Sequence, residues 1–88
     1  LHQNYPNPFN PSTTIRFSLE KRDIISLQVF DLRGRLIKTL LMGESKPGDQ
    51  EIQWNGYNDL EEAVSNGVYL YSIRIKNEIQ SRKMILLR

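Results

Sequence analysis

Apolar and polar side chains alternate over two segments near the start of the chain, residues 13–19 and 24–30. A period of two is typical of strands that bury one face and expose the other. The apolar positions of the two segments are Ile15, Phe17, Leu19, Ile25, Leu27 and Val29. Turn residues at positions 31–34 then precede an apolar run at 36–41, which predicts a hairpin.

The middle of the chain predicts one more strand, followed by a loop. The next extended run begins at Pro47-Gly48, and its residues Gln50, Ile52 and Trp54 share one face. This pattern places Trp54 in the core. Asn55-Gly56 and Asn66-Gly67 are turn signals because these residues tolerate positive φ. They bracket an acidic loop, residues 57–62, and a short strand expected at residues 63–64.

The last hairpin is the clearest element of the pattern. Residues 68–76 alternate, and their apolar face places two tyrosines in the core rather than on a sugar-stacking surface. The members of this face are Tyr69, Tyr71, Ile73 and Ile75. Asn77 is expected in the left-handed turn conformation before residues 79–87 return. The run 84–87 is apolar without alternation, so this strand is either buried on both faces or keeps one face for a partner.

These elements define the expected fold class. No helical period persists for three turns, and about seven short strands with frequent turns predict an all-β, two-sheet antiparallel sandwich, with a closed barrel as the alternative. The 88 residues, 39% of them apolar, fit one small domain. The chain has no cysteine, which excludes disulfides and thiolate metal sites.

Three prolines in six positions precede the first predicted strand. They are Pro6, Pro8 and Pro11. Because proline fixes φ and lacks a donor, residues 1–11 are expected to form a rigid, turned lead-in from an upstream passenger, ahead of a domain at residues 12–88. A plain proline-rich spacer is the alternative. Tyr5 and Phe9 favour a lead-in that packs on its own domain, with both aromatics as apolar anchors.

The net charge is +2, but acidic and basic residues are concentrated in different parts of the chain. The middle of the chain is acidic and the last hairpin is basic. The basic residues of that hairpin are Arg74, Lys76, Arg82, Lys83 and Arg88. Such a hairpin suits an acidic receptor or an anionic surface, whereas the alternative is a solvated edge that blocks aggregation. No nucleic-acid-binding motif is present, so no nucleic-acid partner is predicted.

Residues for catalysis or metal binding are sparse. The only histidine is His2, which lies outside the strand pattern and cannot support a nucleophile or a three-histidine site. Asn58, Asp59, Glu61 and Glu62 offer oxygens to calcium but miss the required spacing, so neither a metal nor another cofactor is predicted. No apolar run reaches the length of a membrane span, and the start carries no leader. We expect a non-enzymatic piece of a longer protein.

Five motifs follow one another along the chain: YPNPFNPSTTIRFSL at residues 5–19, VFDLRGR at 29–35, WNG at 54–56, NGVYLY at 66–71 and KMILLR at 83–88. In this order they resemble the successive signatures of type IX secretion C-terminal sorting domains. The resemblance covers residues 4–88. Glu61 and Asn77 stand where glycines frequently mark turns in that family, which puts the local turn geometry in doubt.

The resemblance implies an immunoglobulin-like sandwich that acts as a non-catalytic delivery signal. Such a domain directs a covalently linked N-terminal passenger across the outer membrane of Bacteroidota-type bacteria. The route leads through the periplasm to the cell surface or the medium. The implied partners are the outer-membrane secretion machinery and a sortase-like processing enzyme.

The expected sites lie at the two ends of the chain. The recognition residues are Lys83, Met84, Ile85, Leu86, Leu87 and Arg88, with the apolar members offering side-chain or strand-pairing contact. The structural motif that clamps the fold is Tyr5, Pro6, Asn7, Pro8, Phe9, Asn10 and Pro11. Two alternatives stay open: the immunoglobulin-like domain of flagellar hook-capping proteins, and an accessory carbohydrate-binding module that stacks sugars on Trp54, Tyr57 or Tyr71.

Overall fold

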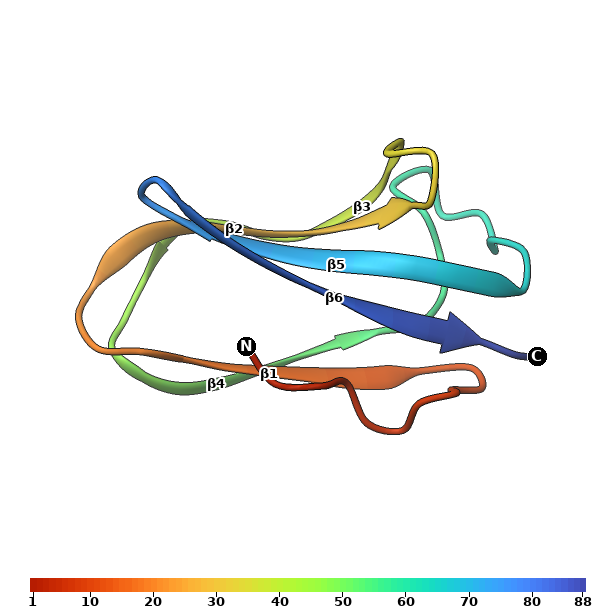
Figure 1. The fold of residues 1–88 in the computed structure, drawn as a ribbon, viewed down its shortest axis with the longest axis horizontal. Coiled ribbons are helices and arrows are strands. Elements are labelled where there is room, and N and C mark those ends of the chain that lie inside the picture. Colours follow the sequence, from red (N-terminus) through yellow and green to blue (C-terminus); the bar gives the residue numbers. More distant parts are fainter.

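Six strands and no helix make up the computed structural model, which describes all 88 residues. The strands are β1 (Thr13–Leu19), β2 (Asp23–Asp31), β3 (Leu36–Ser45), β4 (Gly48–Trp54), β5 (Gly67–Ile75) and β6 (Glu78–Leu86). They form two layers (Figure 1), because β1 pairs with β4 while the second sheet has the order β3-β2-β5-β6. Every pairing is antiparallel. The all-β sandwich is therefore confirmed, and the strands divide into two sheets rather than closing a barrel.

The strand count differs from the expected seven because residues 63–64 do not form a strand. Ala63 makes only an isolated bridge to Tyr57. The Val64 amide donates to the Gly56 carbonyl oxygen at 3.0 Å, so the backbone of this segment is bonded inside its own loop. The structure also contains no helix long and apolar enough to cross a bilayer.

The core lies between the two sheets and follows the alternation of the strands. Its buried apolar residues are Phe9, Ile15, Phe17, Leu19, Ile25, Leu27, Val29, Trp54, Tyr69, Tyr71, Ile73, Met84 and Leu86. Trp54 lies between two other aromatic rings, with centroids 5.7 Å from Phe9 and 5.4 Å from Tyr69. Tilted and edge-on contacts of this kind add to the hydrophobic gain of burial. The predicted core positions of Trp54, Tyr69 and Tyr71 are confirmed.

The turn from β2 to β3 is organised by Asp31. Its carboxylate accepts from the backbone N–H groups of Arg33 and Arg35, each at 2.9 Å. The Arg35 guanidinium donates to the same carboxylate at 2.7 Å. The backbone bond from Arg35 is the main reason that the pKa of Asp31 lies below its ordinary value. Gly34 supplies the positive φ, 85°, that completes this turn.

Two other turns correct the sequence expectations. In the β5–β6 hairpin the left-handed residue is Lys76, with φ of 56°, and not Asn77. The register explains this, because Ile75 pairs with Glu78 and leaves a two-residue turn whose first position is Lys76. Glu61 adopts the left-handed conformation itself, with φ of 64°, so the turn that glycine usually marks is kept.

The first residues of the chain bond to both sheets. On one side, Tyr5 and Thr14 exchange both backbone hydrogen bonds, which extends the small sheet beyond β1. On the other side, the Phe9 amide donates to the Ile85 carbonyl oxygen at 2.9 Å, and the Leu87 amide donates to the Phe9 carbonyl oxygen at 3.1 Å. In Figure 1 this segment runs in red beside β1 and turns toward the end of β6. It therefore closes one side of the sandwich.

The anchors of this lead-in are only partly those expected. Phe9 is 1% exposed and packs in the core, whereas Tyr5 is 73% exposed and anchors nothing. Tyr5 points outward because its backbone continues the alternation set by its partner Thr14. The second anchor is Asn4, which is 2% exposed. Its side chain donates to the Thr13 hydroxyl at 2.9 Å and to the Pro6 carbonyl oxygen at 3.2 Å, so its burial leaves no unsatisfied polar atom.

Candidate recognition surface on the last strand

Strand β6 resolves the ambiguity of the apolar run at residues 84–87. Met84 and Leu86 are fully buried in the core, so neither is accessible to a partner while the domain is folded. Ile85 is 36% exposed and Leu87 is 51% exposed. Lys83 lies on the same outer side as Ile85 and is also exposed. The outer face of β6 therefore presents Lys83 and Ile85 with no second layer over them, and exposed Leu87 follows the end of the strand.

The free edge of β6 is already occupied by the lead-in. Besides the two backbone bonds of Phe9, the Ile85 amide donates to Asn7 Oδ1 at 2.8 Å. Gln3 Nε2 donates to the Lys83 carbonyl oxygen, also at 2.8 Å. A partner strand could pair with residues 83–86 only after displacing residues 3–9, so the folded domain does not offer this end of β6 for strand addition. Asn7 therefore holds the end of β6 by accepting from the Ile85 amide, a contact that its position in the sequence does not indicate.

Arg88 is held by the loop between β4 and β5. Its guanidinium donates to the Gly56 carbonyl oxygen at 2.8 Å and to the Val64 carbonyl oxygen. Its backbone N–H donates to Asn66 Oδ1 at 3.0 Å. A Cβ on Gly56 would lie 2.5 Å from Arg88 Nη2, so this glycine makes room for the guanidinium. Arg88 is therefore a structural anchor, whereas Lys83 forms no ion pair and keeps a free ammonium.

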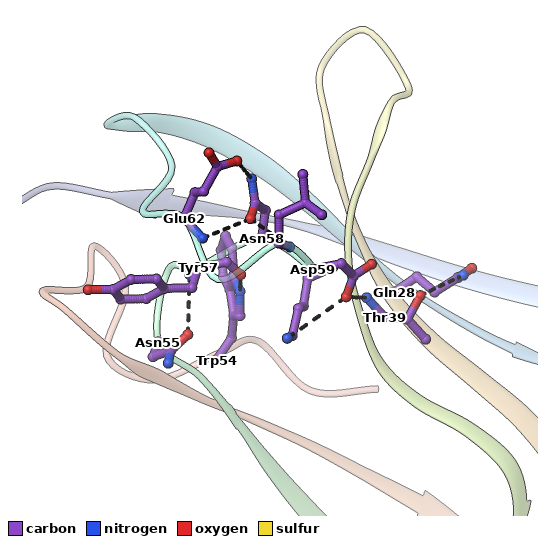
Figure 2. Close-up of polar contacts among 10 residues, drawn as sticks. Gln28, Thr39, Trp54, Asn55, Tyr57, Asn58, Asp59 and Glu62 are labelled. Carbon is purple, nitrogen blue, oxygen red and sulfur yellow. Dashed lines mark hydrogen bonds and ion pairs between the residues drawn. The ribbon is translucent and has the colours of Figure 1, made fainter.

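The acidic loop at residues 57–62 is organised by its own side chains (Figure 2). Asn58 Oδ1 accepts from the backbone N–H groups of Leu60 and Glu62, each at 2.9 Å. Asn58 Nδ2 donates to Glu62 Oε1 at 3.2 Å. These bonds direct the oxygens of the loop toward its own amides, and no three acidic or histidine side chains are grouped to hold a metal ion.

Asp59 connects this loop to the sheet. Its Oδ1 accepts from the Thr39 amide at 3.2 Å and lies 3.8 Å from Lys38 Nζ, as Figure 2 shows. Its own amide donates to the Ile37 carbonyl oxygen at 3.0 Å. The loop thus covers part of the free edge of β3, as the lead-in covers part of the edge of β6. Sequence reasoning missed this contact, and no local signal in the sequence indicates it.

A sugar-stacking platform does not form on the predicted aromatics. Trp54 is 1% exposed and its Nε1 donates to the Tyr57 carbonyl oxygen at 2.9 Å. Tyr71 is fully buried, and its hydroxyl accepts from the Asn4 amide at 2.8 Å. Burial raises the pKa of Tyr71, although the bond from Asn4 acts in the opposite direction. Of the three predicted aromatics, only Tyr57 presents an exposed ring, and a single ring is not a platform.

Comparison with known proteins agrees with this geometry. A family model described as the secretion system C-terminal sorting domain matches residues 3–87. The chain belongs to this family. Sorting domains of the type IX secretion system are non-catalytic signals, and this one directs the protein that carries it to the cell surface or the medium of Bacteroidota-type bacteria. The matched residues include the lead-in as well as β6.

Two solved structures share the fold. One is of PorZ, an essential bacterial surface component of the type IX secretion system of Porphyromonas gingivalis, with a TM-score of 0.67 and 22% identity over 98% of this chain. The other is FlgD from P. aeruginosa, with a TM-score of 0.65 and 14% identity over 85% of this chain. The chain spans only 11% of PorZ and 60% of FlgD. At these identities the likeness establishes the fold alone. No curated protein matched significantly.

Proposed function

We propose that the secretion machinery recognises this sorting domain through the outer side chains of β6, Lys83 and Ile85, and through Leu87, which follows the strand. Met84 and Leu86 fix the strand on the core, and Arg88 fixes the end of the chain to the β4–β5 loop. The observation that supports this division is the alternation of burial along β6, from fully buried Met84 and Leu86 to Ile85 at 36% exposure. Side-chain contact is favoured over strand addition because the lead-in bonds the edge of β6.

We also propose the rest of the route that the family resemblance implies. A passenger is covalently linked ahead of the lead-in, crosses the periplasm in transit and leaves through the outer membrane. A sortase-like enzyme then separates the passenger from the sorting unit at residues 12–88. Residues 1–11 clamp the start of the fold, because Phe9 is buried and Tyr5 pairs with Thr14, and this clamp sets the direction in which the passenger leaves.

A secreted reporter tests the recognition surface. A fluorescent protein followed by residues 1–88 is expressed in a bacterium with a type IX system, and the fraction in the medium and on the cell surface is measured. Ile85→Glu and Lys83→Glu are each expected to lower that fraction several-fold, because one removes apolar contact and the other reverses a free charge.

Ile79→Glu is the matched control. Ile79 lies on β6 at 55% exposure, outside the six recognition residues 83–88, and its substitution is expected to leave secretion nearly unchanged. Thermal unfolding of the purified fusions separates recognition from folding. The proposal fails if a fusion carrying both Lys83→Glu and Ile85→Glu is secreted as efficiently as the unaltered one.

A further inference from the structure

The outer face of the four-stranded sheet carries an apolar row that crosses all four strands. The register places Ile85 opposite Val68 on β5, and Lys83 opposite Leu70. Leu70 lies opposite Phe30 on β2, and Phe30 lies opposite Leu36 on β3. Residues opposite each other in neighbouring strands share a face of the sheet. We call the set Leu36, Phe30, Leu70, Val68 and Ile85 the outer apolar row.

No part of the chain covers this row. The small sheet, β1 with β4, lies on the other face of β3-β2-β5-β6, as Figure 1 shows. Leu36 is 48% exposed and Ile85 is 36% exposed, while Val68, Leu70 and Phe30 are partly exposed. The next row on the same face is polar, because Ser72 bonds Ser81 at 2.6 Å and Gln28 bonds Thr39 at 3.3 Å. The outer apolar row is therefore a contiguous apolar group at one end of the face, which is typical of an interaction site. Beyond the polar row, the same face carries a second exposed group, Ile24, Met42 and Ile79.

The charged side chains of this face that form no ion pair are basic. Lys83 lies in line with the outer apolar row, and Arg74 lies on the same face opposite Ile79. Neither forms an ion pair. The acidic residue on this face, Glu44, is already paired with Arg22 at 3.0 Å. Charge complementarity therefore favours a partner with carboxylates around an apolar centre.

We propose that the outer apolar row is the docking surface for a protein of the secretion machinery whose own surface is apolar and bordered by carboxylates. This inference rests on the proposed function and extends it from β6 to side chains of β5, β2 and β3. It also explains why strand addition is not needed, because a flat sheet face offers side-chain contact while the lead-in keeps the edge of β6 covered.

The test uses Leu36, because it belongs to the row but is distant from the last strand in sequence. In the reporter fusion, Leu36→Glu is expected to reduce secretion several-fold, and Leu36→Lys is expected to reduce it clearly less. Both changes remove the same apolar contact, and only the first places a negative charge against the proposed carboxylates. Leu60→Glu is the matched control, because Leu60 is 78% exposed in the β4–β5 loop and belongs to no strand of this sheet.

The outcomes separate the two proposals. If Leu36→Glu is secreted like Leu60→Glu while Ile85→Glu is retained, the extended docking surface is wrong and recognition by β6 stands. If Leu36→Glu and Leu36→Lys are reduced equally, the acidic partner is wrong. If neither Leu36→Glu nor Ile85→Glu has an effect, both proposals fail. Unfolding temperatures of the fusions, measured in parallel, must stay close to that of Leu60→Glu for a loss to count as support.

Discussion

Two irregular segments of this sandwich each cover a sheet edge but differ in how much of the core they contribute. The lead-in, residues 1–11, and the β4–β5 loop, residues 55–66, are both rich in turn-forming residues. The lead-in buries Asn4 and Phe9 and bonds to both sheets. The loop buries only the small residue Gly56 and is held mainly by side-chain bonds at the surface. Composition therefore does not decide whether such a segment belongs to the core.

The comparison indicates that the lead-in, and not the loop, determines whether the edge of β6 is accessible. Removing the lead-in would expose both an apolar cavity at Phe9 and the free edge of β6. Loosening the loop would free Arg88 and part of the edge of β3, and it would remove the carbonyl partners of Trp54 Nε1 and the Tyr69 hydroxyl. Since stability differs across a structure, the two segments should open with very different free energies. Four substitutions measure that difference.

The largest effect is expected from Phe9→Ala. The ring is 1% exposed and contacts Trp54, so its removal leaves a cavity between the two sheets. Loss of a buried phenylalanine lowers the free energy of unfolding by about 3–5 kcal/mol. Denaturant unfolding followed by Trp54 fluorescence would measure this. Tyr5→Ala, at a residue that is 73% exposed, should change stability little. Equal effects of the two substitutions would mean that the lead-in is a spacer after all.

Much of this fold was predictable because strand patterns are local. The first strand lies at residues 13–19 as predicted, since three buried apolar side chains in alternation define it. The lead-in was harder to predict, because Asn7 bonds to Ile85, 78 residues away, and no local pattern shows such a partner. The role of Arg88 was missed for the same reason, since its acceptors lie in a distant loop. The left-handed residue of the last hairpin depends on register, which periodicity alone leaves open by one position.

Tyr71→Phe should have the second largest effect, and it depends on pH. The buried hydroxyl accepts from the Asn4 amide at 2.8 Å and donates to the His2 carbonyl oxygen at 2.7 Å. Its removal leaves these groups without their partner and lowers the free energy of unfolding by about 1–3 kcal/mol. Tyr57→Phe is the control, because the Tyr57 ring is 39% exposed and its hydroxyl makes no hydrogen bond within the protein.

The free energy of unfolding at alkaline pH gives a second measurement of the Tyr71 contact. Burial raises the pKa of Tyr71 above its ordinary value of 10.0, so the unfolded chain loses this proton first as pH rises. The stability from the neutral hydroxyl is fully present below the unfolded pKa and is lost as pH rises through the folded pKa. Tyr71→Phe should therefore lose less stability than the unaltered protein at high pH. An unchanged slope would show that this hydroxyl titrates as if exposed.

Arg88→Ala should affect the loop and leave the lead-in intact. The guanidinium binds the carbonyl oxygens of Gly56 and Val64, and its loss is expected to lower the free energy of unfolding by about 1 kcal/mol. The rate of amide hydrogen exchange should rise in the loop but not at Phe9. Arg33→Ala is the control, since the Arg33 side chain makes no hydrogen bond or ion pair. If exchange rose equally in both segments, the two would open together and the comparison would not hold.

The smallest effect is expected from Asn58→Ala, because the Asn58 bonds lie at the surface. Its side-chain oxygen accepts from the amides of Leu60 and Glu62, and water can replace it at both. The free energy of unfolding should fall by only about 0.5 kcal/mol, while exchange of these two amides becomes faster. Asn10→Ala in the lead-in is the matched control. Asn10 is exposed and its side chain makes no hydrogen bond. Its substitution should leave the free energy of unfolding unchanged, because Phe9 and Asn4 hold that segment. A larger effect at Asn10 than at Asn58 would show that surface polar contacts, and not buried anchors, keep the lead-in in place.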